Sequence, residues 1–183
     1  ETLRALDDLI RAGKVRYVGC SNARAWQLYE ALWAADKRGL ARFDSIQLPY
    51  SMLARQVEQD LLPACAHAGV SVIAFAALAG GVLSGAHDDA IQPGTVLAAR
   101  PGYQQQFLTA RNRERLQRFA TLAAQLGKPR IQLALDAVLG AEAVAAATVG
   151  VQTPAELEPL VAAVNEPLEA AQRQAVRELF ADA

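Results

Sequence analysis

Hydrophobic positions along the chain follow two spacings that alternate. In the segment ETLRALDDLIRAGK, Leu3, Leu6 and Ile10 recur at the spacing of an amphipathic helix, and Gly13 supplies a stop. The segment VRYVGC that follows, residues 15–20, is short, apolar and rich in β-favouring residues, so it predicts a buried strand. Further helices are predicted over 25–39, 56–69, 109–127, 129–140, 153–164 and 168–180, and further strands over 43–50, 70–78 and 143–151.

This alternation predicts an α/β fold with four parallel strands, whose ligands bind at the carboxyl ends of the strands. Two architectures fit, an open doubly wound sheet and half of an eight-stranded barrel, and periodicity does not distinguish them. A barrel of units of roughly 30 residues needs about 250 residues, so this chain of 183 would hold about half of one. The stretch 79–106 is predicted to be irregular, and loops of that length are commonly functional.

Composition removes several classes of function. The net charge is −1, 20% of residues are charged, and no block of like charge occurs, so neither nucleic acid nor a charged membrane surface is an expected partner. No apolar run reaches the roughly 18 residues of a spanning helix, and no signal peptide is recognisable. Cys20 and Cys65 lie in different elements and are expected to be reduced. These features favour a soluble, cytoplasmic protein.

Polar or aromatic residues stand at the ends of three predicted strands. Ser21 and Asn22 follow the first strand, where they can bind a ligand or cap the helix that begins near Ala25. Gln47, in the second strand, needs hydrogen-bond partners, and a structural bond is the alternative to a binding role. Phe75 ends the third strand before the small residues of AALAGG, which allow close approach to the backbone, although an aromatic there is usually part of the core.

The helix near Thr153 offers free N–H groups that can bind a phosphate, but Thr153 as N-cap with Pro154 in the first turn explains this sequence without a ligand. His67 and His87 have no surroundings that suggest catalysis. Neither a nucleophile motif nor the ligand spacing of a metal cluster accompanies them.

Five segments together are more specific than any single residue. GKVRYVGCSN, SIQLPYSMLAR, LLPACAHAGVSVIAF, LAGGVLSG and VGVQTPAEL occur in an order and spacing that resemble the aldo-keto reductases. The resemblance covers essentially the whole chain and implies the second half of a TIM (β/α)8 barrel, equivalent to strands 5 to 8. Since Glu1 already lies within a helical pattern, 1–183 is expected to be a single partial barrel domain, incomplete at the N-terminus.

The resemblance also implies a site for NADP or NAD. Ser21 and Asn22, assisted by Gln47, resemble the residues that hydrogen-bond the nicotinamide carboxamide, and Phe75 stands where an aromatic stacks on the ring. The segment expected to pass the pyrophosphate includes Ala76, Leu78, Ala79 and Gly80. The residues expected around the adenosine phosphate end are Gly150, Gln152 and Glu156.

Several positions depart from the family pattern. Ala86 replaces a lysine and Val96 an arginine, although Arg100 can reach in, while Pro159 and Leu160 replace a Glu-Asn pair. Each lost charge-assisted contact costs about 1.5–3 kcal/mol, so weakened cofactor binding is expected. Glu156 also disfavours a 2′-phosphate.

The family's catalytic Asp, Tyr, Lys and His lie on the first four strands, so no catalytic residue is assigned to this chain. The expected function is the cofactor-binding half of an NAD(P)H-dependent reductase of small aldehydes or ketones, with the isolated chain inactive. One alternative is a non-catalytic relative that binds nucleotide or serves as an interaction protein. Another is an open flavodoxin-like domain, which would be a stable monomer. Half a barrel exposes two strand edges, so three outcomes are open: aggregation, self-association that closes the sheet, or existence only as a piece of a longer protein, which is the favoured one.

Overall fold

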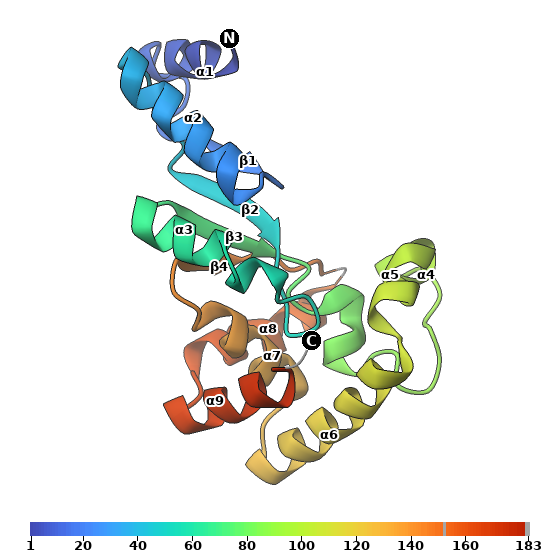
Figure 1. The fold of residues 1–183 in the computed structure, drawn as a ribbon. Helices are drawn as coiled ribbons and strands as arrows, with labels where there is room; N and C mark the ends of the chain where they lie inside the picture. The colour runs from blue at the N-terminus through green and yellow to red at the C-terminus, as the bar shows by residue number, and fades with distance from the viewer. Residues whose placement is uncertain (152, 182–183) are drawn as a thin grey trace.

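The four predicted strands form one parallel sheet. The structure is a computed structural model that describes residues 1–151 and 153–181. The strands lie side by side in chain order (Figure 1). They are β1 (Gly19–Ser21), β2 (Ser45–Pro49), β3 (Ser71–Phe75) and β4 (Val144–Ala147). Because consecutive strands are neighbours and parallel, all four carboxyl ends meet at one edge of the sheet.

Helices connect the strands and follow the last one. The α-helices are α1 (Thr2–Arg11), α2 (Ala25–Arg38), α3 (Leu61–Ala68), α4 (Val96–Ala99), α5 (Pro101–Phe107), α6 (Ala110–Leu126), α7 (Arg130–Leu139), α8 (Pro154–Asn165) and α9 (Ala170–Leu179). Two 3-10 helices are η1 (Gln56–Glu58) and η2 (Ala79–Ser84). Gly39 and Gly69 end α2 and α3 in the left-handed conformation, which explains the sharp stops that the sequence predicts there.

Two sequence predictions need correction. The first strand is not residues 15–20: β1 contains only Gly19–Ser21, and Tyr17 is 75% exposed, because pairing with β2 begins only at Gly19 opposite Ser45. The stretch 79–106 is not irregular, since η2, α4 and most of α5 lie within it. Leu97 of α4 and Phe107 of α5 are buried in the core, and this burial stabilises the two short helices.

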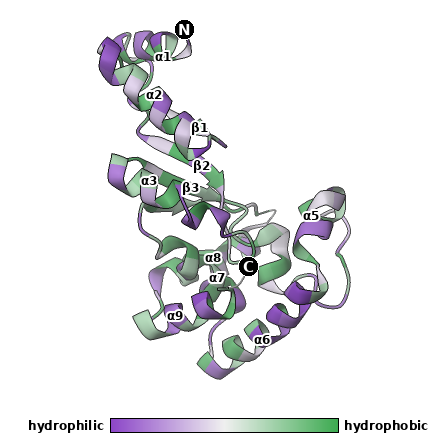
Figure 2. Ribbon diagram, viewed as in Figure 1, coloured by the Kyte–Doolittle hydropathy of each residue, from purple (hydrophilic) through white to green (hydrophobic). Residues whose placement is uncertain are grey.

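The two faces of the sheet differ. Ile46, Leu48, Val72 and Ala74 are buried in a core shared with the helices. Hydrophobic residues dominate α7, whereas hydrophilic and hydrophobic residues alternate along α6 (Figure 2). The opposite face, here called the open face, is not buried. It consists of Gly19, Ser21, Ser45, Gln47, Ser71, Ile73 and Phe75.

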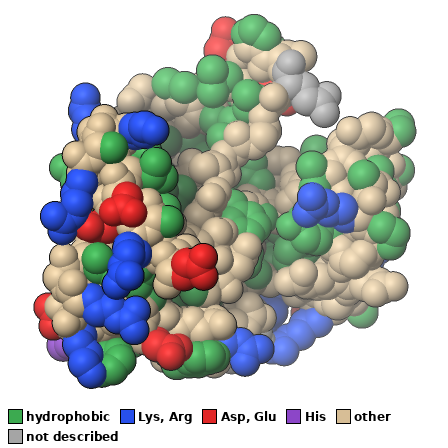
Figure 3. Space-filling view, turned by 90° about the horizontal axis from the view of Figure 1, so that it is seen from above, with side chains coloured by type: hydrophobic (Ala, Val, Ile, Leu, Met, Phe, Trp, Pro, Cys, Tyr) green, Lys and Arg blue, Asp and Glu red, His purple; other side chains and the backbone are tan. Residues whose placement is uncertain are grey.

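An open face is unusual for a parallel sheet, which normally carries cover on both sides. Seen from above, the molecule is hollowed at its centre, with hydrophobic side chains in the hollow (Figure 3). Within the described residues, β1 pairs only with β2 and β4 only with β3, so each has one free edge. The sheet therefore offers an uncovered face and two unpaired edges.

Candidate functional site

Ser21, Asn22 and Gln47 meet at the carboxyl edge of the sheet, and we call them the amide row. The register places Ser21 directly opposite Gln47 on the open face. The Ser21 hydroxyl donates to the Gln47 carbonyl oxygen at 3.2 Å, and the Asn22 backbone N–H donates to the same oxygen at 2.9 Å. This one carbonyl thus fixes the carboxyl end of β1 against β2.

The two carboxamides of the row keep their hydrogen-bonding capacity. In the part of the chain that the structure describes, neither the Asn22 nor the Gln47 side chain has a hydrogen-bond partner. Asn22 is exposed and Gln47 half-buried, so both can be reached from the open face. A half-buried amide normally satisfies its donors and acceptor, so the unpartnered Gln47 carboxamide, near the exposed carboxamide of Asn22, favours a ligand site.

The structure does not support the alternative role of Ser21 and Asn22 as helix caps. The N-cap residue of α2 is Arg24, whose backbone N–H is accepted by the Gln27 Oε1 at 2.9 Å. Ser21 instead donates to the neighbouring strand. Asn22 adopts a left-handed conformation with φ of 57°, which turns the chain away from the strand before the helix begins.

Beyond β3, the backbone is held in left-handed conformations that residues with a Cβ seldom adopt. Ala76 and Ala79 have φ values of 55° and 51°, and the Ala79 N–H donates to the Ala76 carbonyl at 2.8 Å. Gly80 follows with φ of 69°. Strained backbone of this kind collects at ligand sites, where the surrounding structure maintains it. Phe75 is half-buried beside this turn, with its ring on the open face.

Two residues that sequence reasoning did not assign support the turn at Gly80. His87 is buried, its Nε2 lies 3.1 Å from the Gly80 carbonyl oxygen, and its Nδ1 accepts the Gln92 N–H at 3.2 Å. The proton is therefore on Nε2. A methyl group on Gly80 would lie 3.4 Å from the Tyr103 ring. Neither role has a sequence signal, since both depend on a loop folding back onto the turn.

Arg100 lies near this turn through Tyr103. Its guanidinium carbon is 5.5 Å from the centre of the Tyr103 ring, close enough for a cation–π contact. Ala86 and Val96 are exposed apolar residues at the positions where the family resemblance calls for cations. Arg100 therefore places a basic group over the Tyr103 ring, and this ring lies next to Gly80.

At the far end of the predicted site, Thr153 caps α8, with its Oγ1 accepting the Glu156 N–H at 3.4 Å and Pro154 in the first turn. The interpretation without a ligand is therefore sufficient for this helix end. Gly150 follows β4 at the carboxyl edge of the sheet and is exposed, as is Glu156. Gln152 lies outside the described residues.

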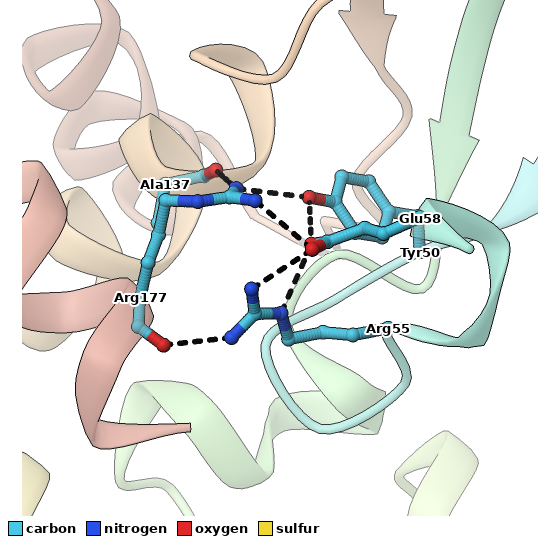
Figure 4. Close-up of polar contacts among 5 residues, drawn as sticks. All are labelled: Tyr50, Arg55, Glu58, Ala137 and Arg177. Atoms are coloured by element: carbon cyan, nitrogen blue, oxygen red, sulfur yellow. Dashed lines mark hydrogen bonds and ion pairs between the residues drawn. The ribbon is translucent and has the colours of Figure 1, made fainter. Parts of the chain in front are cut away.

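A second polar cluster lies just past β2 and is fully bonded (Figure 4). The Tyr50 hydroxyl donates to Glu58 Oε1 at 2.6 Å and accepts from Arg177 Nη1 at 3.1 Å. Arg55 donates to the Glu58 carboxylate from Nε at 2.9 Å and from Nη2 at 2.8 Å, and its Nη1 donates to the Arg177 carbonyl oxygen at 2.7 Å. The cluster fastens α9 to the end of β2.

The surroundings of this cluster set two pKa values. Burial, followed by the hydrogen bond to Glu58, raises the pKa of Tyr50 to about 12. Burial alone would raise the pKa of Glu58, but hydrogen bonds from Arg55 and Tyr50 bring it below its usual value. A tyrosine so strongly held in its neutral form and so thoroughly engaged is a structural group.

Other candidate chemistry is not brought together. Ser21, His87 and Asp88 cannot act as a triad, because Ser21 and His87 bind backbone groups and Asp88 pairs with Arg130 at 2.6 Å. Among the described residues, no three His, Cys, Asp or Glu side chains are placed to hold a metal. Both cysteines are free, as expected, and burial raises the pKa of Cys65 to about 11.

A helix capable of crossing a bilayer is likewise absent from the described residues.

Comparison with known proteins gives the family. The sequence model of the Aldo/keto reductase family matches residues 1–181. The chain is 33% identical over 165 residues to the uncharacterized oxidoreductase YrpG of Bacillus subtilis, a match that covers 90% of this chain and 49% of that protein. It is 40% identical over 93 residues to protein tas of Escherichia coli, covering 51% and 27% of the two chains.

A third relative carries a substrate in its name. Versiconal hemiacetal acetate reductase of Aspergillus parasiticus is 36% identical over 84 residues, which are 46% of this chain and 24% of that protein. The chain spans about half the length, or less, of these relatives. Because the family match runs over nearly all of its residues, the chain belongs to the aldo/keto reductase family.

Proposed function

We propose that this chain is the cofactor-binding half of an NAD(P)H-dependent aldo-keto reductase, an oxidoreductase that reduces small aldehydes or ketones to alcohols. The observation that carries the proposal is the amide row, with two unpartnered carboxamides at the carboxyl edge of the sheet. Membership of the family and relatives named as oxidoreductases support the reaction class.

The amide row fits the carboxamide of a nicotinamide ring. Since the Ser21 hydrogen is used on the Gln47 carbonyl, its oxygen is left to accept from an amide N–H. The Asn22 and Gln47 carboxamides can each donate and accept, so together they can match both ends of another amide. When bound, the cofactor supplies the hydride. The residues of the chain orient the ring that carries it.

Phe75 and the turn after it suit the rest of the cofactor. Phe75 lies opposite Pro49, two residues along the sheet from the Gln47–Ile73 pair, and its aromatic ring is a flat apolar group on which another ring can stack. The left-handed turn at Ala76, Ala79 and Gly80 exposes backbone rather than side chains to an approaching phosphate. Glu156 and the exposed apolar Ala86 and Val96 supply no positive charge, so we expect weak binding and little preference for NADPH over NADH.

We also propose that the four strands are the second half of a TIM barrel. The uncovered face and two free edges are what such a half would present. None of the four tyrosines is a suitable proton donor beside the amide row: Tyr17 is exposed before β1, Tyr29 donates to Ala64, Tyr50 is fully bonded and Tyr103 packs at Gly80. The 183 residues alone are expected to lack carbonyl reductase activity.

Calorimetric titration with NADPH and NADH tests the proposal. Asn22→Ala and Gln47→Ala should each weaken binding about tenfold, as expected for a lost hydrogen bond worth about 1.4 kcal/mol. Gln125→Ala, an exposed amide on α6, is the matched control and should leave binding unchanged. Binding that survives both site substitutions would rule out the amide row as the nicotinamide site.

The exposed apolar residues Ala86 and Val96 favour one alternative, a non-catalytic relative that serves as an interaction protein. The same titration separates the two functions. Saturable binding that depends on Asn22 supports the reductase, while no binding of either nucleotide at millimolar concentration supports the interaction protein. Reduction of a carbonyl panel by the 183-residue chain would refute the absence of a proton donor.

A further inference from the structure

The peptide between Gly80 and Gly81 depends on its neighbours for its orientation. Both glycines have positive φ, of 69° and 95°, and glycine adopts positive and negative φ about equally readily, so this peptide can rotate unless it is held. Its N–H, from Gly81, donates to the Leu78 carbonyl oxygen at 3.0 Å. Its carbonyl, from Gly80, accepts the Nε2 proton of His87 at 3.1 Å. The turn itself therefore holds one end of the peptide, and a side chain from the following loop holds the other.

The His87 ring fits closely against this peptide. A methyl group on Gly81 would lie 3.0 Å from Nε2, so the ring packs directly on the turn. The side chain is buried, and its second nitrogen, Nδ1, accepts the Gln92 N–H at 3.2 Å. Because both ring nitrogens have a backbone partner, the ring is held in one orientation and one tautomer.

The loop that carries His87 is fastened in turn to helix α7, most of which is buried. Asp88 accepts two hydrogen bonds from the guanidinium of Arg130, the first residue of α7, at 3.0 and 2.6 Å. The same guanidinium fills the space beside Gly85, where a methyl group would overlap it. Two parallel bonds between a guanidinium and a carboxylate fix direction as well as distance. A continuous set of contacts therefore runs from α7 through the loop to the Gly80 carbonyl.

Fixed geometry matters at this turn because side-chain charge is reduced there. Ala86 and Val96 are exposed and apolar, so neither adds a positive charge for a phosphate. Backbone N–H groups can still bind an anion where left-handed residues direct them into a concave turn. Ordering a mobile turn on binding costs affinity, so a turn that is already fixed binds its ligand more tightly.

We propose that His87 is a positioning residue for cofactor binding. It fixes the Gly80–Gly81 peptide in the orientation that receives the pyrophosphate of the dinucleotide, and it acts through the Gly80 carbonyl rather than by touching the phosphates. The proposal rests on the proposed function, because its ligand is the dinucleotide of that site. Held backbone then supplies part of the affinity that cations at Ala86 and Val96 would have given.

Two substitutions separate the contacts of His87. The side-chain amide of His87→Gln can place its NH2 where Nε2 stands and still donate to Gly80. The shorter amide of His87→Asn can place its oxygen where Nδ1 stands, so it keeps only the contact with Gln92. Calorimetric titration with NADH should give affinity within about twofold of the wild type for His87→Gln and about tenfold weaker for His87→Asn. His67→Asn, at an exposed histidine on α3, is the matched control and should bind like the wild type.

ADP-ribose, which carries the pyrophosphate but no nicotinamide, separates this role from that of the amide row. His87→Asn should weaken the binding of ADP-ribose by the same factor as the binding of NADH, because the turn contacts the part that the two ligands share. Asn22→Ala should weaken only NADH. Asp88→Asn, which releases the loop from Arg130 and leaves the turn unchanged, should weaken both ligands about two- to threefold.

Hydrogen exchange in the absence of nucleotide gives an independent measurement. The Gly81 N–H should exchange faster in His87→Asn than in the wild type and His87→Gln. Circular dichroism shows whether each variant is folded, and His87→Gln and Asp88→Asn test the proposal even if His87→Asn does not fold. Unchanged affinity in His87→Asn, or an equal loss in His87→Gln, would overturn this inference and leave the amide row in place. A wild type that binds neither NADH nor NADPH would overturn the proposed function, and this inference with it.

Discussion

Two polar clusters lie close together along β2, and they differ in how fully their hydrogen bonds are used. Just past the strand, Tyr50 and Glu58 exchange bonds with Arg55 and Arg177 until every charged group has an opposite partner (Figure 4). In the strand itself, Gln47 contributes only its backbone to Ser21 and Asn22, and its side chain has no described partner.

The difference separates a structural cluster from a binding site. Charged groups that saturate one another are positioned to hold α9 against the sheet, and a ligand would have to break those bonds to use them. Amides that face an open surface with unused donors and acceptors lose only water when a ligand binds. Residue type alone would rank Tyr50, Glu58 and the arginines above Ser21 and Gln47, and the hydrogen-bond inventory reverses that order.

The largest expected effect is on the saturated cluster. Glu58→Gln removes the carboxylate charge that Arg55 and Arg177 share, so two half-buried guanidinium groups lose their counter-ion. Urea unfolding should show a loss of about 2–3 kcal/mol. Glu114→Gln, an exposed position on α6, should change stability by less than about 0.5 kcal/mol. A folded Glu58→Gln protein that had lost NADPH binding would contradict the separation of the two clusters.

The next effect concerns the backbone beneath the amide row. A methyl group on Gly19 would lie 2.4 Å from Ser45 Oγ and 2.8 Å from the Ser45 carbonyl oxygen, and the carbonyl cannot move without disturbing the β1–β2 pairing. Gly19→Ala should cost about 1–3 kcal/mol of stability and weaken NADPH binding.

Gly102→Ala is the control for this substitution, because a methyl group on Gly102, in α5, meets nothing within 4 Å. It should be neutral or slightly stabilising in urea unfolding. If Gly19→Ala behaved like Gly102→Ala in both unfolding and titration, the pairing of β1 with β2 at Ser45 would not set the geometry of the row.

The sequence predicted the order of helices and strands well, because apolar spacing and glycine stops are local signals. Gly39 and Gly69 end their helices where expected. The first strand was placed too early, since Val15 and Tyr17 have high strand propensity but lie beyond the pairing with β2. Strand propensity is a preference of the individual residue, whereas pairing with a distant segment decides whether that residue lies in a strand.

The candidate site was predicted with less completeness. The juxtaposition of Ser21 with Gln47 followed from parallel strands, whose ends share one edge. His87 contacts Gly80, seven positions away, because a loop folds back, and Arg177 contacts Tyr50, 127 positions away, because the last helix packs against the end of β2. Neither contact produces a periodic pattern in the sequence from which it could be predicted. Which polar residues remain unbonded can be known only after such contacts are assigned.

The smallest effect is a pH dependence confined to the saturated cluster. The pKa of Tyr50 is raised to about 12, whereas an unfolded tyrosine has a pKa of about 10. The folded protein therefore holds this proton more tightly than the unfolded chain does. The resulting stability is fully present below pH 10 and is lost as the pH rises from about 10 to 12. Unfolding free energies measured across this range should fall more steeply for the wild type than for Tyr50→Phe. Equal slopes would mean that neither burial nor the hydrogen bond to Glu58 holds the Tyr50 proton, which would place this cluster, like the amide row, among the groups still open to a partner.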